Sequence, residues 1–265
     1  MLSAEDPQSE NKTVPLQCLE IRGGNYRVSH ALDLPGLTGW LHSEPSEQST
    51  EGGDVHFFSL CSKGALARLA LADVSGHGQS ASSLAIVLRR LIQKHIDTWD
   101  QSELMRQLND SLNRRVTHSR YASAILLAYY EPTSELVFTN AGHPPPLWYR
   151  AKMKSWEWLE SKGTSNHYIE GLPLGLIPGT DYVQLAVRLE PEDRLILYTD
   201  GITEARDRDG ETLEQEGLLA MAQSLDVDEP AQMSDALLTR LHEFRGGRPP
   251  DDDHTLCILR TKARH

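Results

Sequence analysis

Residues 65–95 read ALARLALADVSGHGQSASSLAIVLRRLIQKH, a strand-like run followed by an amphipathic helix. The apolar run 67–72 predicts a buried strand that ends at Asp73, and Gly76 and Gly78 then leave the backbone free to turn. From Gln79 onward apolar positions recur with the helical period, which predicts a helix packed against the sheet. These positions are Ala81, Leu84, Ala85, Leu88, Leu91 and Ile92, followed by His95.

The segments on either side of this stretch predict an α+β protein. A second amphipathic helix follows directly, and we expect Ser102 to be its N-cap. Its apolar face comprises Leu104, Leu108, Leu112 and Val116. Short turn-like links at 62–64 and 131–134 join strand-like runs and imply antiparallel hairpins. Because strands and helices do not alternate, we predict a sandwich with helices outside antiparallel sheets, not a doubly wound parallel sheet.

The remaining elements fit one domain. Further strand-like runs are 55–61, 122–130, 135–139, 146–149, 182–189, 194–198 and 255–259, and further helical runs are 213–224 and 231–244. No linker-like stretch separates these runs, so we expect a single domain over residues 17–265. The polar residues 1–16 are expected to form a flexible N-terminal tail.

Composition narrows the class of protein. The net charge of −12, with no basic stripe, argues against a nucleic-acid partner. No run of about 18 apolar residues predicts a membrane span. The three cysteines, Cys18, Cys61 and Cys257, are odd in number and lack CxxC spacing, which is typical of reduced thiols. We therefore predict a cytoplasmic protein with no nucleic-acid and no membrane partner.

Four aspartates lie at the edges of predicted strands. Asp73 and Asp200 end such runs, whereas Asp54 and Asp252 precede them. Each of them alone reads more readily as a helix cap, a turn residue or a solvated charge. Four in one domain are much less probable as coincidence, and separately delivered carboxylates are the ligands that hard divalent cations prefer. The pattern therefore predicts a metal-dependent hydrolase with an aspartate cluster.

Six motifs occur in a characteristic order along the chain. They are Gly52-Gly53-Asp54, Asp73-Val74-Ser75-Gly76-His77-Gly78, Asn140-Ala141-Gly142-His143-Pro144, Gly171-Leu172-Pro173-Leu174-Gly175, Tyr198-Thr199-Asp200-Gly201-Ile202-Thr203-Glu204-Ala205 and Asp252-Asp253-His254-Thr255. Over roughly residues 25–261 this set resembles the SpoIIE-type branch of the protein phosphatase 2C-like (PPM) family.

The resemblance implies a four-layer α-β-β-α sandwich, the PPM phosphatase fold, with two antiparallel sheets flanked by helices. It also implies a pair of Mn²⁺ or Mg²⁺ ions that activate the attacking water. The implied metal ligands, catalytic through that water, are Asp54, Asp73, Asp200 and Asp252, together with the backbone carbonyl of Val74. Asp253 is the alternative to Asp252 if the register differs by one residue.

The resemblance further implies a serine/threonine phosphatase that acts on a phosphorylated regulatory protein of the anti-sigma-factor-antagonist type. Regulation would come from a partner or from a homodimer. The run Asp54-Val55-His56-Phe57-Phe58 lacks an acid that relatives commonly carry. A non-catalytic partner-binding module is therefore an open alternative, as is a hydrolase of small phosphoesters. His77 and His143 are left out of the catalytic set, and His143 is expected to support a loop.

Overall fold

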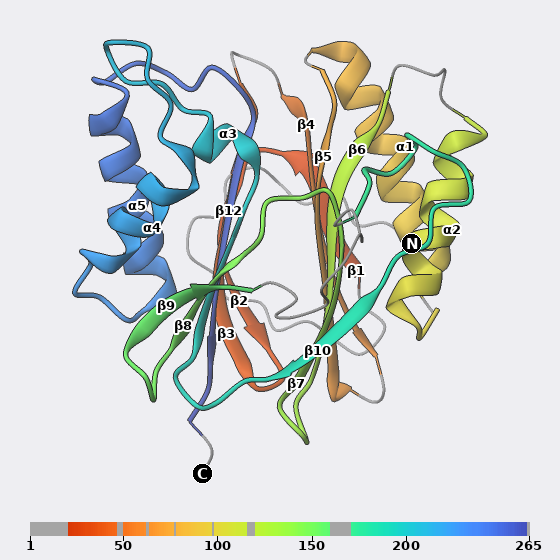
Figure 1. Cartoon of the computed structure of the whole chain (residues 1–265), viewed down its shortest axis with the longest axis horizontal. Helices are drawn as coiled ribbons and strands as arrows, with labels where there is room; N and C mark the ends of the chain where they lie inside the picture. Colours follow the sequence, from red (N-terminus) through yellow and green to blue (C-terminus); the bar gives the residue numbers. More distant parts are fainter. Residues whose placement is uncertain are drawn as a thin grey trace, which may run out of the picture.

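Two six-stranded sheets pack face to face in the computed structural model, which describes residues 21–46, 50–61, 64–76, 78–96, 98–115, 120–159 and 171–263 (Figure 1). The first sheet has the order β1-β4-β5-β6-β7-β10, and each neighbouring pair is antiparallel. Its strands are β1 (Ile21–Tyr26), β4 (Glu51–Cys61), β5 (Leu66–Val74), β6 (Ala122–Tyr130), β7 (Glu135–Ala141) and β10 (Gln184–Arg188).

The second sheet has the order β2-β3-β12-β11-β8-β9 and is also antiparallel throughout. Its strands are β2 (Val28–Leu34), β3 (Leu37–Glu44), β8 (Leu147–Arg150), β9 (Ser155–Trp158), β11 (Arg194–Tyr198) and β12 (His254–Thr261). Since β11 and β12 are adjacent and antiparallel, the end of β11 and the start of β12 meet at one edge of the sandwich.

Helices cover the outer faces of both sheets (Figure 1). α1 (Gln79–His95) and α2 (Gln101–Asn113) lie on the first sheet. α4 (Glu214–Gln223) and α5 (Pro230–Phe244) lie on the second, next to the single turn α3 (Asp200–Thr203). The predicted four-layer α-β-β-α sandwich is confirmed.

The apolar run at residues 69–72 of β5 follows from this layering. Leu69 and Leu71 pack into the core between the two sheets, whereas Ala70 and Ala72 pack against the helices outside. A strand buried on both faces needs apolar residues at successive positions, and small alanines let α1 approach the sheet closely. Asp73, the last residue but one of β5, therefore lies partly buried near the end of the strand.

The antiparallel pairings predicted across residues 62–64 and 131–134 are confirmed by β4–β5 and β6–β7. The prediction that Ser102 caps α2 is wrong. The N-cap is Asp100, whose carboxylate accepts hydrogen bonds from the backbone N–H groups of Ser102 and Glu103 at 2.9 and 3.0 Å. Asp100 occupies the better capping position because its extended backbone turns the side chain back onto the first helical turn.

Four strands, β1, β2, β3 and β9, were not predicted. In β3, every second residue faces the core between the sheets, as Leu37 and Leu41 do. The alternate residues of β3 face the layer of α5 and, apart from Trp40, are polar, as His42 and Glu44 are, so the strand lacks a clear apolar run. None of the helices in the described ranges is long and apolar enough to cross a membrane. The predicted tail, 1–16, lies outside the described residues, and the extent of the domain over 17–265 stays a prediction.

Candidate active site

The four predicted aspartates come to the same edge of the sandwich because of strand direction. β4 and β5 pair with Val55 opposite Ala72, so Asp54 near the start of one strand lies beside Asp73 near the end of the other. In the second sheet, Asp200 follows the end of β11 and Asp252 precedes the start of β12. Antiparallel neighbours place these starts and ends side by side.

Asp54 links the two sheets. Its side chain is 3% exposed, and Oδ2 accepts hydrogen bonds from the hydroxyls of Thr199 and Thr255, both at 2.7 Å. Its other oxygen, Oδ1, is buried without a hydrogen-bond partner among the described residues. An unsatisfied buried carboxylate oxygen is costly unless a cation neutralises it. The donor set at Asp54 therefore fits a hard divalent ion.

Asp253 is held by backbone groups of the opposite sheet and its loop. The N–H of Gly53 donates to Oδ2, and the N–H of Ser46 donates to Oδ1 at 2.6 Å. A Cβ at Gly52 would lie 2.6 Å from this carboxylate, so glycine is required for the close approach. Asp252, by contrast, is exposed and accepts a hydrogen bond from the N–H of Asp253 at 2.8 Å. Both oxygens of Asp253 are thus already used by the fold.

Val74 and Asp200 flank these groups. A Cβ on Gly53 would lie 3.2 Å from the carbonyl oxygen of Val74, which places that carbonyl beside the Asp54 segment. Asp200 does not sit in the tight turn expected from the Asp-Gly pair, because it begins α3. Gly201 is needed for a different reason: its Cβ would lie 2.0 Å from the carbonyl oxygen of Asp253.

The carboxylates are close enough to raise one another's pKa. Burial raises the pKa of Asp73 to about 9, and the negative charges of Asp54 and Asp200 contribute to the rise. Burial likewise raises the pKa of Asp54 to about 8, against the hydrogen bonds from the two threonines. Burial, Glu204 and Asp252 raise the pKa of Asp200 to about 6. Such a cluster holds its full negative charge only when cations bind.

The cluster is not compact. Within the part of the chain that the structure describes, no three of these aspartates bring their carboxylate oxygens within 4.8 Å of one another. At least one of these carboxylates would therefore have to move before three of them could bind a single ion together.

Sequence reasoning missed the residues that hold the carboxylates. Thr199 and Thr255 fix Asp54, and the buried Arg245 donates from Nη2 to the carbonyl oxygen of Gly201 at 3.2 Å. Thr199 and Thr255 lie within two of the six motifs, which is the signal that could have found them. Nothing in the local sequence distinguishes Arg245 from an ordinary helix-end residue.

Two histidines, His77 and His143, were considered as catalytic groups, and the structure describes only His143. His77 lies outside the described residues. His143 is buried, its Nδ1 pairs with the hydroxyl of Ser123 at 2.8 Å, and its backbone exchanges two hydrogen bonds with Asn140. Burial lowers the pKa of His143 to about 3, so the ring stays neutral. These contacts match the expected loop-supporting role.

The raised pKa values predict how the metal-free protein responds to pH. A carboxyl that keeps its proton when folded but loses it near pH 3.8 when unfolded makes the folded state the more protonated one. The free energy of unfolding should then fall as pH rises from about 4 toward 8–9, by up to about 1.4 kcal/mol per pH unit per group. Thermal melting in chelator at a series of pH values checks this.

Two comparisons isolate the cause of that pH dependence. Asp73→Asn should flatten the melting profile, since asparagine does not titrate. Mn²⁺ should raise the melting temperature more at about pH 8 than at about pH 6, because binding must displace fewer protons there. A profile that is equally steep in Asp73→Asn would contradict the assignment to this cluster.

Comparison with known proteins identifies a matching protein family and related phosphatases. The family model "Stage II sporulation protein E (SpoIIE)" matches residues 63–262. Phosphoserine phosphatase RsbU of Bacillus subtilis (strain 168) is 28% identical over 241 residues, which is 88% of this chain and 64% of the relative. This chain therefore spans somewhat less than two thirds of that protein.

Solved structures share the fold. The RsbU and RsbW domains of Rv1364c from Mycobacterium tuberculosis are 25% identical with a TM-score of 0.70, covering 91% of this chain and 64% of that one. The PP2C phosphatase domain and a regulatory fragment of SpoIIE from Bacillus subtilis are 18% identical with a TM-score of 0.69, covering 92% and 64%. The latter similarity bears on the fold alone.

Proposed function

This chain belongs to the SpoIIE family, and we propose that it is a metal-dependent protein phosphatase that hydrolyses phosphoserine or phosphothreonine in another protein. The observation that carries the proposal is the meeting of four strand-end aspartates at one edge of the sandwich. The raised pKa values of Asp54, Asp73 and Asp200 and the unpartnered Oδ1 of Asp54 are what a cation site requires.

We propose that the ligands of two Mn²⁺ or Mg²⁺ ions are Asp54, Asp73, the carbonyl of Val74, Asp200 and Asp252. An all-oxygen donor set suits either ion. Asp252 is preferred to Asp253 because the N–H groups of Gly53 and Ser46 hold both oxygens of Asp253, whereas the exposed Asp252 is freer to turn toward an ion. When bound, such a pair supplies a water of lowered pKa and neutralises the oxygens of the phosphate.

The chain's own residues orient this donor set. The hydroxyls of Thr199 and Thr255 both donate to Oδ2 of Asp54, which directs Oδ1 away from them. Thr199 Oγ1 also accepts from the N–H of Thr255 at 2.8 Å, so the ends of β11 and β12 move together. The clamp on Asp253 fixes the backbone next to Asp252. Ligands held on strand ends in this way need little rearrangement when they bind an ion.

For the substrate, we propose a phosphorylated regulatory protein of the anti-sigma-factor-antagonist type in the cytoplasm. The similarity to RsbU, which is named a phosphoserine phosphatase, supports a phosphoserine substrate. The net charge of −12 would repel a phosphoprotein in the absence of cations, so metal ions are also needed to admit it.

Phosphate release measured with and without Mn²⁺ tests the proposed activity. We expect Mn²⁺-dependent turnover of a phosphoserine protein, and little turnover of small phosphoesters at the same concentration. Binding of the phosphoprotein without turnover would favour the partner-binding module instead. Rapid turnover of small phosphoesters alone would favour the small-phosphoester hydrolase. Undiminished turnover in excess chelator would reject a metal-dependent mechanism of any kind.

A further inference from the structure

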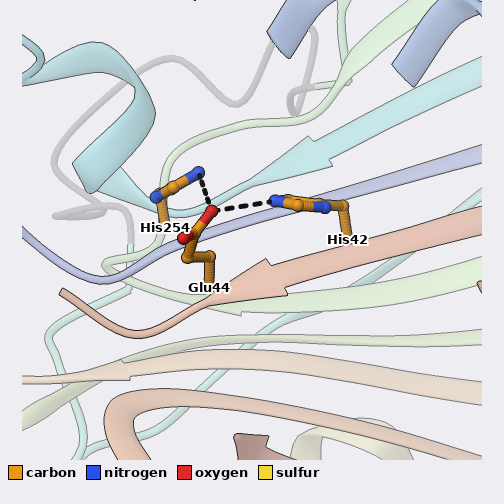
Figure 2. Close-up of side chains that lie close together, drawn as sticks. All are labelled: His42, Glu44 and His254. Atoms are coloured by element: carbon orange, nitrogen blue, oxygen red, sulfur yellow. Dashed lines mark ion pairs between the residues drawn. The ribbon is translucent and has the colours of Figure 1, made fainter. Parts of the chain in front are cut away.

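A second group of potential metal ligands lies on the outer face of the second sheet. His42 and Glu44 are two residues apart on β3, and His254 begins β12 directly opposite Glu44. Their ligand atoms all lie within 4.8 Å of one another. Figure 2 shows the two imidazole rings turned toward the same carboxylate from different sides.

The three side chains converge without bonding tightly to each other. Nε2 of His42 lies 3.7 Å from Oε2 of Glu44, and Nε2 of His254 lies 4.0 Å from the same oxygen. Both distances exceed a normal hydrogen bond. Tetrahedral zinc with bonds of about 2.0–2.2 Å separates neighbouring ligand atoms by roughly 3.3–3.5 Å. Small side-chain rotations would therefore bring the three atoms to bonding distance of one ion.

This group is separate from the aspartate cluster because neighbouring strand residues face opposite ways. Thr255 points into the space between the sheets, where it donates to Asp54 and pairs with Ser43 at 2.9 Å. His254 precedes Thr255 and points to the opposite face, toward the layer of α5. The two sites thus lie on opposite faces of the second sheet.

The surrounding charges are balanced. Arg27 pairs with Oε1 of Glu44 at 2.7 Å, which leaves Oε2 directed at the histidines. Asp235 of α5 lies near enough to His42 to add negative potential. Arg245 adds positive potential at His254, and the negative charge of Asp251, which acts on Arg245, offsets part of that potential. A dication is therefore not repelled by an excess of positive charge.

We propose that His42, Glu44 and His254 bind one zinc ion, or a similar late transition-metal ion, which ties the end of β3 to the start of β12. Two imidazole nitrogens and one carboxylate suit zinc and leave a fourth position for water. Mg²⁺ prefers oxygen ligands, so it would occupy the aspartate cluster and not this site. The ion stabilises the fold next to Asp252 and does not take part in hydrolysis.

A zinc titration of the full chain in millimolar Mg²⁺ tests the proposal, because excess Mg²⁺ competes with zinc for the oxygen ligands of the aspartate cluster. We expect one zinc per chain and a melting temperature raised by roughly 5 °C at about 100 times Kd. His42→Gln should weaken zinc binding at least about tenfold. His242→Gln, the same change at an exposed position on α5, should bind zinc as the unsubstituted protein does.

Two further measurements keep the test decisive if His42→Gln folds poorly. Glu44→Gln should weaken zinc binding similarly. In the unsubstituted protein, Co²⁺ in place of zinc should give paramagnetically shifted imidazole N–H resonances from two histidines. Unchanged zinc affinity in both variants, or the absence of these resonances, would overturn the proposal. Neither result would bear on Mn²⁺-dependent phosphatase activity.

Discussion

Replacing Asp73 by asparagine should lower phosphatase activity by at least about a thousand-fold, which corresponds to about 4 kcal/mol of transition-state stabilisation. The negative charges of the neighbouring aspartates all raise the pKa of Asp73, which places Asp73 among them. These neighbours are Asp54, Asp200, Asp252 and Asp253. Asparagine keeps the shape of the side chain but removes the charge and one anionic oxygen, so the cations lose a ligand while the fold is retained. Initial rates on a phosphoserine protein in Mn²⁺ measure the effect.

Asp226→Asn provides the matched control, since it makes the same change at an exposed position. It should leave the rate within about twofold, as expected of surface substitutions. Isothermal titration with Mn²⁺ should show weaker binding in Asp73→Asn and unchanged binding in Asp226→Asn. Equal rates in the two variants would show that Asp73 is not a metal ligand of the active site.

Gly201→Ala should damage both the stability of the fold and the geometry of the aspartate cluster. The new Cβ would lie 2.0 Å from the carbonyl oxygen of Asp253 and 3.0 Å from its carbonyl carbon, and both are backbone atoms that cannot rotate away. Either α3 or the segment before β12 must shift, which moves Asp200 or Asp252. We expect a loss of about 1–3 kcal/mol in the free energy of unfolding and about a hundredfold in activity.

Gly217→Ala is the appropriate control for this change. Its Cβ would lie 2.6 and 2.9 Å from side-chain atoms of Leu213, which can rotate where a backbone carbonyl cannot, and alanine favours the helix α4 in which it lies. Denaturant unfolding should show a smaller loss of stability for Gly217→Ala than for Gly201→Ala. If Gly201→Ala is equally stable and active, the close contact with Asp253 has been misjudged.

Much of the fold could be predicted because the spacing of apolar residues along short segments indicates strands and helices. The apolar run before Asp73 and the helical spacing after Gln79 are short-range signals, and both elements form where expected. β3 could not be predicted in this way, because its outward face carries His42 and Glu44 and depends on cover from α5. Asp100 was missed as the cap of α2 because Ser102 is an equally acceptable residue type at a neighbouring position.

The strand-end positions of the aspartates could be predicted from local sequence, whereas the residues that hold them could not, and the assignment of the aspartates as metal ligands stays a prediction. A strand-end aspartate such as Asp54 can be recognised from the glycines and apolar residues around it. The two hydroxyls that hold it come from Thr199 and Thr255, which are 145 and 201 residues away in sequence. Such contacts depend on how the two sheets pack. The same holds for His254, whose approach to Glu44 depends on strand register.

Anomalous scattering from a crystal of the protein grown with Mn²⁺ would locate the proposed metal ions and their ligands. We expect two manganese peaks at the edge of the sandwich, bonded between them to the carboxylates of Asp54, Asp73, Asp200 and Asp252 and to the carbonyl of Val74. Manganese bound elsewhere, or bound through Asp253 with Asp252 turned to solvent, would contradict this ligand assignment.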